Sequence, residues 1–305
     1  MSAEISGDLR VLACVNPASG SVAPRGAAET RRDIEARLRD GGYACESVIG
    51  SALELKEAIS HAMRGAPPAL VVVAGGDGTI AATAGALADS GLALAPLPGG
   101  TMNLFVRDLG LPNDLNAALD LCLRGRRDKV DVAAFDGRVF VNNVAFGAYA
   151  ALAEGREKMR AADATTEKIR AIAEIAYAAA DGAPIGMRIE LDGDVVDVES
   201  NFLMVANNLY TDADALRPTR ARLDEGVLGA YVTHSRNAGD FFSRVAEAMS
   251  GDLDASRDVD VRRAQRCRVV VDRDTVAAID GDPVQIPRGE VALRILPKAL
   301  TVLRP

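Results

Sequence analysis

The stretch Val71-Val-Val-Ala-Gly75-Gly-Asp-Gly-Thr79 carries the strongest fold signal in the chain. An apolar run enters a glycine turn and the helical segment Thr79–Ala88 follows, so the stretch predicts a strand, a tight turn and a helix. Glycines in such a turn permit positive φ angles and let a ligand approach the backbone closely. N–H groups at the turn and at the helix start attract anions. The structural alternative is an ordinary strand-to-helix turn in which Asp77 caps the helix.

The segments around this stretch alternate in the same way. We expect strands at Val11–Val15, Tyr43–Ile49 and Leu94–Leu97, and helices at Ala27–Arg39 and Leu53–Met63. Strands that alternate with helices are typical of a parallel sheet covered on both faces. The N-terminal part is therefore predicted to be an α/β domain with a mostly parallel, doubly wound sheet.

The second part of the chain changes pattern to strands in succession. A hairpin of Val130–Phe135 and Arg138–Asn143 is expected to turn at Asp136-Gly137, and a long helical stretch, Ala150–Ala180, follows it. Further strands are expected at Met187–Leu191, Val195–Ser200, Phe202–Ala206, Gly229–Thr233, Arg268–Val271, Val276–Ile279 and Val291–Leu296. This succession predicts a β-rich, antiparallel, sandwich-like second domain.

Two more polar loops follow predicted strands of the first domain. They are Asn16-Pro17-Ala18-Ser19-Gly20 and Pro98-Gly99-Gly100-Thr101-Met102-Asn103. Open parallel sheets place ligand sites outside the carboxyl ends of their strands, so three such loops predict a phosphate-binding site. Asp77 would offer a carboxylate to phosphate-bound magnesium. Neither GxxxxGK[ST] nor a strand-associated GxGxxG occurs, which disfavours a P-loop ATPase, a protein kinase and a common dinucleotide dehydrogenase.

The composition narrows the functional classes. The 305 residues carry a net charge of -8, which disfavours a general nucleic-acid binder and broad adhesion to anionic membranes. Four scattered cysteines and two histidines leave carboxylates as the expected acid–base groups. Residues 1–10 do not resemble a signal peptide, and no apolar run reaches the ~18 residues of a membrane span. We therefore expect a cytoplasmic protein.

Three stretches resemble the signatures of the diacylglycerol kinase catalytic-domain family, which includes bacterial lipid kinases and sphingosine kinases. These stretches are Asn16–Gly20, Gly75–Thr79 and Gly100–Pro112. Later segments are similar to further elements of the family: Asn207–Leu228, Ala278–Pro283 and Leu296–Leu303. GGDGT alone is shared with NAD kinases, so the combination carries the specificity.

The resemblance implies an ATP- and magnesium-dependent lipid kinase of two domains. Residues 1–127 would bind ATP, residues 128–296 would hold the lipid, and residues 297–305 would return to the first domain. The residues implied to contact the nucleotide are Asn16, Pro17, Ala18, Ser19, Gly20, Ser47, Gly75, Gly76, Asp77, Gly78, Thr79, Gly100, Thr101 and Asn103.

The resemblance also implies acid–base and metal groups. Asp280 or Asp282 would be the general base that accepts the proton of the acceptor hydroxyl, whereas the residues alone favour a hairpin turn at Asp280-Gly281. Asp77 would hold magnesium. Glu225 with the main-chain carbonyl of Val227 would form a second metal site, and a solvated turn is the alternative there.

Several positions depart from the family pattern. Ala82 stands where the family often has Glu, Leu104 where many diacylglycerol kinases have Asp, and Asp282 where Glu is usual. Two other functions stay open. A kinase of a soluble acceptor, similar to NAD kinases, would share GGDGT, and a nucleotide-binding relative without catalysis is suggested by Ala82 and Leu104.

The expected partners are a lipid with a free hydroxyl and, transiently, a membrane surface at the cytoplasmic side of the inner membrane. The helical stretch Ala150–Ala180 is interpreted as a lid or a membrane contact, with a solvated helix face as the alternative, because its charges are mixed. Nucleic acid is not expected as a partner, and a homodimer is left open.

Overall fold

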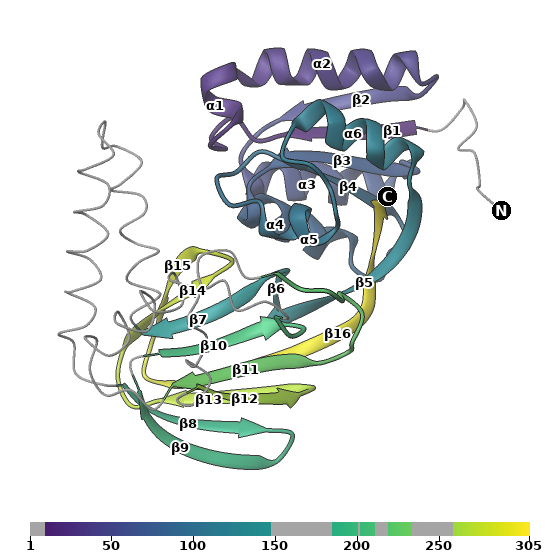
Figure 1. Cartoon of the computed structure of the whole chain (residues 1–305). Helices are drawn as coiled ribbons and strands as arrows, with labels where there is room; N and C mark the ends of the chain where they lie inside the picture. Colours follow the sequence, from purple (N-terminus) through teal and green to yellow (C-terminus); the bar gives the residue numbers. More distant parts are fainter. Residues whose placement is uncertain (1–9, 148–184, 201, 211–218, 234–258) are drawn as a thin grey trace, which may run out of the picture.

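The computed structural model describes residues 10–147, 185–200, 202–210, 219–233 and 259–305 (Figure 1). Its first part contains parallel strands in the order β2-β1-β3-β4. The strands are β1 (Arg10–Val15), β2 (Ala44–Ile49), β3 (Leu70–Gly75) and β4 (Ala93–Pro98). Strands β3 and β4 are buried along their whole length because helices cover both faces of the sheet.

Helices pack on both sides of this sheet (Figure 1). One side carries α1 (Val22–Arg25), α2 (Ala27–Asp40) and α6 (Leu115–Arg124), and the other carries α3 (Ala52–Arg64) and α4 (Asp77–Leu87). Helix α2 buries Thr30, Ile34 and Leu38, which lie on one face at a spacing of four residues. The short helix α5 (Leu104–Asp108) follows the β4 loop. The predicted α/β domain with a doubly wound sheet is confirmed.

The second part is built from antiparallel strands in two layers. One layer contains β5 (Arg126–Phe135), β6 (Arg138–Phe140), β8 (Ile185–Leu191), β9 (Asp194–Ser200), β13 (Arg266–Val271) and β16 (Gly289–Arg304). The other has the order β12 (Val259–Ala264), β11 (Leu228–Thr233), β10 (Phe202–Asn207), β7 (Asn143–Gly147), β14 (Thr275–Ile279) and β15 (Asp282–Ile286). Apolar side chains between the layers form the second core, which confirms the predicted antiparallel sandwich-like domain.

Strand β16 joins the two parts. Its first half pairs with β13, its second half pairs in parallel with β4, and β5 runs antiparallel beside it with a register shift between Leu296 and Leu300. Along β5, Val130 packs in the first core and Phe135 in the second. Two continuous strands therefore cross between the cores without a linker (Figure 1). The boundaries at residues 127 and 297 stay a prediction.

One sequence expectation for this part is wrong. Arg138–Asn143 was expected to be a single strand, but β6 ends at Phe140 and β7 begins at Asn143 in the other layer. Between them, the carboxylate of Asp280 accepts hydrogen bonds from backbone N–H groups that a strand partner would otherwise satisfy.

Three strands were not predicted: β7, of which the expected strand covers only Asn143, and β12 and β15. Strands β12 and β15 lie at the two edges of their sheet. Edge strands tolerate charges and proline, so Asp260, Arg262 and Arg263 in β12 and Pro283 in β15 obscured the alternation. The expected helix Ala150–Ala180 lies outside the described residues. In the parts of the chain that the structure describes, no helix combines the length and apolarity that crossing a membrane requires.

Gly125 provides a test of how β16 closes the first core. A Cβ atom at Gly125 would lie 2.3 Å from the carbonyl oxygen of Arg304, the last residue of β16. Gly125→Ala should therefore lower the free energy of unfolding by about 1–3 kcal/mol, measured by urea denaturation. Gly65→Ala is the matched control, because a Cβ there would meet only the oxygen of Ala62, at 3.9 Å. Equal stability of the two variants would contradict this packing of β16.

Candidate active site

The three glycine-containing loops meet at the carboxyl ends of β1, β3 and β4. The N–H of Asn16 donates to the carbonyl of Ala74 at 3.0 Å, and the N–H of Gly99 donates to the carbonyl of Gly75 at 2.9 Å. The N–H of Ser21 donates to the carbonyl of Gly99 at 2.9 Å. The structure thus brings together the loops that the strand order predicted to be neighbours.

Polar side chains hold these loops to one another. The Nδ2 of Asn16 donates to the Oγ1 of Thr79 at 2.7 Å, and the Oγ of Ser19 accepts from the N–H of Gly76 at 3.2 Å. Asn103, at a φ of 49°, closes its own loop, because its Oδ1 accepts from the N–H of Gly100 at 2.8 Å. These residues organise the loop backbones.

The glycines let the loops pack tightly. A Cβ at Gly99 would lie 2.6 Å from the nitrogen of Gly75, and one at Gly100 would lie 2.7 Å from the Cα of Gly76. These distances are too short for any side chain. The glycines are therefore required by contact between loops, a reason that the sequence argument about close ligand approach did not include.

Helix α4 begins at this junction with an open N-terminus. Its N-cap, Gly76, provides no side-chain cap, and the first intrahelical bond runs from the N–H of Ile80 to the carbonyl of Gly76 at 3.0 Å. Within the described residues, the N–H groups of Asp77, Gly78 and Thr79 have no acceptor. Free N–H groups and the helix dipole together favour an anion at this place.

Asp77 caps a different helix from the one it begins. Its carboxylate accepts from the N–H of Leu104 at 3.2 Å, the N–H of Phe105 at 3.1 Å and the Nδ2 of Asn142 at 3.1 Å. The structural alternative, in which Asp77 caps its own helix, is therefore wrong, because its oxygens bind the start of α5 instead.

The donor set of Asp77 limits how magnesium could bind. A carboxylate has roughly four acceptor positions, and three are used here. Among the described residues, no cluster of three or more His, Cys, Asp or Glu is arranged to hold a metal ion. Asp77 therefore has about one acceptor position left, so it would be a single protein ligand of a magnesium ion whose other ligands would come from phosphate and water.

Asp280 lies at the turn between β14 and β15. Asp280 and Gly281 have φ angles of 50° and 88°, which is the geometry of a two-residue hairpin turn. The Asp280 carboxylate accepts from the N–H groups of Val141 at 2.9 Å, Asn142 at 2.7 Å and Asn143 at 3.2 Å. Burial nevertheless raises its pKa to about 7, opposed by these hydrogen bonds and assisted by the charge of Asp77.

Two other aspartates occupy equivalent turns. Asp136 and Asp192 have φ angles of 45° and 51°, and each precedes a glycine. The carboxylate of Asp136 accepts one backbone N–H group, from Ala292, and that of Asp192 accepts two, from Gln265 and Arg266. Asp280 therefore does occupy a hairpin turn, as the residues alone indicate. Asp280 differs from the other two in its connection, through Asn142, to Asp77.

Asn142 and Arg220 are site residues that sequence reasoning missed. Asn142 touches both carboxylates: its N–H donates to Asp280, and its Nδ2 donates to Asp77. Arg220 donates to the Oδ1 of Asn142 at 2.8 Å and forms an ion pair with Asp108 at 2.7 Å. Two consecutive amides at positions 142 and 143, inside an otherwise apolar pattern, were the one sequence signal for this cluster.

Asp282 lies against the first turn of α4. A Cβ at Gly78 would lie 2.7 Å from its Oδ2, and that oxygen accepts from Arg138 at 3.2 Å. Its side chain is 58% exposed, so it faces solvent more than Asp280 does. Which of the two carboxylates is the base stays a prediction.

The hydroxyl of Ser47 forms its hydrogen bond with helix α2 and not with the loop junction. Ser47 pairs with Ala13 inside β2, two residues before the strand ends, and its hydroxyl donates to Glu35 of helix α2. Its predicted contact with the nucleotide stays a prediction.

Glu225 has a buried oxygen without a partner. Within the described residues its Oε2 has no hydrogen-bond donor, while the carbonyl of Val227 accepts from the N–H of Asn208 at 3.0 Å. An unpaired carboxylate oxygen fits a cation, so the residues present are compatible with the second metal site that was predicted there.

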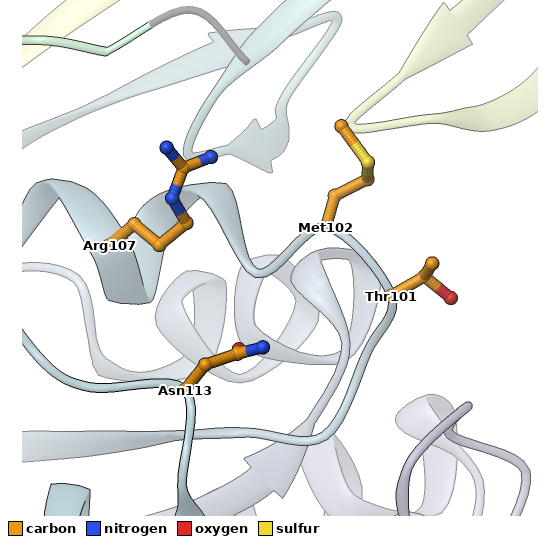
Figure 2. Close-up of a pocket in the computed structure, with 4 residues that line it drawn as sticks. All are labelled: Thr101, Met102, Arg107 and Asn113. Carbon is orange, nitrogen blue, oxygen red and sulfur yellow. The ribbon is translucent and has the colours of Figure 1, made fainter. Parts of the chain in front are cut away.

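A pocket opens beside the loop that follows β4. It is lined by Thr101, Met102, Arg107 and Asn113, and Figure 2 shows Met102 and Arg107 extending to the same side of the loop. Pro17, Ala18 and Gly20 are exposed at the neighbouring loop. The apolar side chain of Met102 and the cationic side chain of Arg107 therefore lie near the exposed residues of the loop that follows β1.

Comparisons with known proteins agree with this architecture. The family model of the diacylglycerol kinase catalytic domain matches residues 10–135, and that of the YegS C-terminal NAD kinase beta sandwich-like domain matches residues 142–304. Diacylglycerol kinases of Staphylococcus aureus strains JH9 and Newman are each 26% identical over 258 residues, which is 81% of this chain and 77% of theirs.

A crystal structure of a diacylglycerol kinase from Bacillus anthracis strain Sterne superposes with a TM-score of 0.69 at 21% identity and covers 97% of both chains. At that identity the superposition shows a shared fold. The two family models together span both cores described above. The chain therefore belongs to the diacylglycerol kinase catalytic-domain family, a family of kinases.

Proposed function

We propose that this protein transfers the γ-phosphoryl group of ATP to the hydroxyl of a lipid, of diacylglycerol or sphingoid type. One observation carries the proposal. The open N-terminus of α4 lies at the junction of three loops, and a chain of hydrogen bonds from Asp77 through Asn142 leads from there to Asp280 of the second part. Phosphate groups and a general base would thus be held on opposite walls of one site.

The loop junction is suited to a triphosphate. The N–H groups of Asp77, Gly78 and Thr79 would donate to phosphate oxygens, since they are uncommitted within the described residues. Asn16, Ser19 and the glycines would act by keeping the loops rigid. Phosphoryl transfer depends mainly on positioning and charge neutralisation, so preformed donors suit this reaction.

Asp280 would hold the proton that the lipid hydroxyl loses. Its Oδ1 and Oδ2 are fixed by the N–H groups of residues 141–143, which orients the carboxylate before substrate binds. A pKa of about 7 suits a base that works near neutral pH. Magnesium, when bound, supplies positive charge to the phosphate oxygens, and Asp77 is the carboxylate that this chain would offer it.

The acceptor class can be tested directly. Purified protein is incubated with radiolabelled ATP, magnesium and, separately, diacylglycerol, monoacylglycerol, a sphingoid base, ceramide, phosphatidylglycerol and NAD. We expect label in a lipid product. Labelled NAD phosphate without labelled lipid would identify the alternative soluble acceptor. Nucleotide binding without turnover on any acceptor would identify a non-catalytic relative.

Replacing the proposed base should strongly reduce turnover without unfolding the protein. We expect Asp280→Asn to lower kcat by about 10²–10⁴-fold, because the amide cannot accept the hydroxyl proton. Asp192→Asn is the matched control, since Asp192 occupies the same kind of turn and its carboxylate accepts two backbone N–H groups at 2.8 Å. A full rate for Asp280→Asn would remove Asp280 as the base and leave Asp282 as the candidate.

The pH dependence follows from the raised pKa of Asp280. The base must be deprotonated, so kcat/KM should increase with pH with a midpoint at about 7. The same group binds its proton more tightly in the folded protein than in the unfolded chain, where its pKa is 3.8. Its contribution to stability is therefore present at low pH and is lost as the pH rises through about 7. A rate profile with its midpoint near the unperturbed value would contradict this assignment.

A further inference from the structure

Arg220 and Asp108 form a buried ion pair between the two parts of the protein. The Nε of Arg220 donates to the Oδ2 of Asp108 at 2.7 Å, and the side chains are 0% and 1% exposed. Asp108 ends helix α5, whereas Arg220 precedes β11. Removing two charges from water is costly, so such a pair persists only when its remaining donors are also satisfied.

The guanidinium group meets that condition. Its Nη1 donates to the carbonyls of Val141 at 2.6 Å and Asn207 at 2.8 Å, and its Nη2 donates to the Oδ1 of Asn142 at 2.8 Å. Arg220 therefore binds both the backbone and the side chain at the crossing from β6 to β7. This crossing is the segment whose N–H groups bind Asp280.

Asn142 acts as an adaptor because its amide has one accepting end and one donating end. Arg220 can only donate, and the carboxylate oxygens of Asp77 accept hydrogen bonds. With Arg220 on its Oδ1, the Nδ2 of Asn142 must face Asp77, to which it donates at 3.1 Å. Arg220 thus fixes which way the amide points.

The contacts close into a ring. Asp77 binds the N–H groups of Leu104 and Phe105 at the start of α5, and Asp108 at the end of α5 binds Arg220. From Arg220 the ring returns through Asn142 to Asp77. Helix α5 is therefore held at both ends by groups that also set the place of Asn142.

We propose that Arg220 is a positioning residue for phosphoryl transfer, acting through Asn142 to hold Asp77 and Asp280 in a fixed mutual arrangement. The proposal rests on the proposed function in so far as it concerns turnover. Arg220 is assigned no contact with substrate. Replacing Arg220 should therefore change kcat and leave the KM for ATP nearly unchanged, because Asp77 is the residue that the ring shares with the nucleotide-binding loops.

The first test replaces the ion pair by apolar residues. Asp108→Leu combined with Arg220→Met removes both charges together, a change that buried pairs often tolerate in stability. We expect a melting temperature lower by a few degrees, because the carbonyls of Val141 and Asn207 lose a donor. We also expect a similar KM for ATP and a kcat that is lower by about 10- to 100-fold, since Asn142 is no longer oriented. The control is Arg188→Met with Asp197→Leu, an exposed pair on β8 and β9 that should leave every parameter unchanged.

The second test changes the adaptor alone. Asn142→Asp keeps an acceptor for Arg220 but cannot donate to Asp77, so it should reproduce the loss in kcat. Asn142→Gln keeps both ends of the amide and should retain more activity than Asn142→Asp. A kcat within about twofold of the wild type in both the double variant and Asn142→Asp would overturn the proposal, because a misplaced group would cost far more.

A third measurement does not depend on turnover. The side-chain amide of Asn142 is followed by NMR in protein labelled with ¹⁵N at asparagine, and its signal is assigned through Asn142→Asp. We expect the signal to shift in the Asp108→Leu/Arg220→Met double variant. An unmoved signal would overturn the proposal even if the wild type phosphorylated no lipid, whereas a wild type without turnover and a shifted signal would count against the proposed function alone.

Discussion

The Asp280 carboxylate binds three successive backbone N–H groups where the chain passes from one sheet to the other, and the site depends on this interaction. Without it, the N–H groups of Val141 and Asn142 would lie in the interior without acceptors, because β6 has ended and β7 has not begun. The same interaction brings a carboxylate from the β14–β15 hairpin to the wall that faces the loops of the first domain. One hydrogen-bonded group therefore serves the fold and, in our proposal, the chemistry.

Strands β5 and β16 explain why this arrangement can be precise across two cores. Both strands run through the boundary, pair with each other over most of their length and contribute side chains to each core. Continuous sheet pairing resists relative rotation more than a loop linker would. The ring through Asp108, Arg220, Asn142 and Asp77 adds polar contacts of defined direction to this framework. Backbone pairing thus sets how the two parts of the site lie relative to each other, and the side-chain ring fixes the orientation of individual groups.

Sequence reasoning identified the loops and the fold because their signals are local. The glycine turn after β3 and the alternation of strands and helices can be recognised from residues that are close together in the sequence. Asn142, Arg220 and the true partner of Asp77 were missed because each depends on residues that are distant in the chain: 65 positions separate Asn142 from Asp77, and 112 separate Arg220 from Asp108. A charged residue in a loop also reads as solvated until its burial is known. Strand β15 was not predicted because it contains Pro283. Proline argues against an interior strand, but β15 lies at the edge of its sheet, where proline is tolerated.

The most direct measurement of the central claim is a crystal structure of the protein with a non-hydrolysable ATP analogue and magnesium. The account predicts phosphate oxygens within hydrogen-bond distance of the N–H groups of Asp77, Gly78 and Thr79, and a γ-phosphate that faces the Asp280 carboxylate across a space for one hydroxyl group. A nucleotide bound elsewhere, or a γ-phosphate directed away from Asp280, would contradict it.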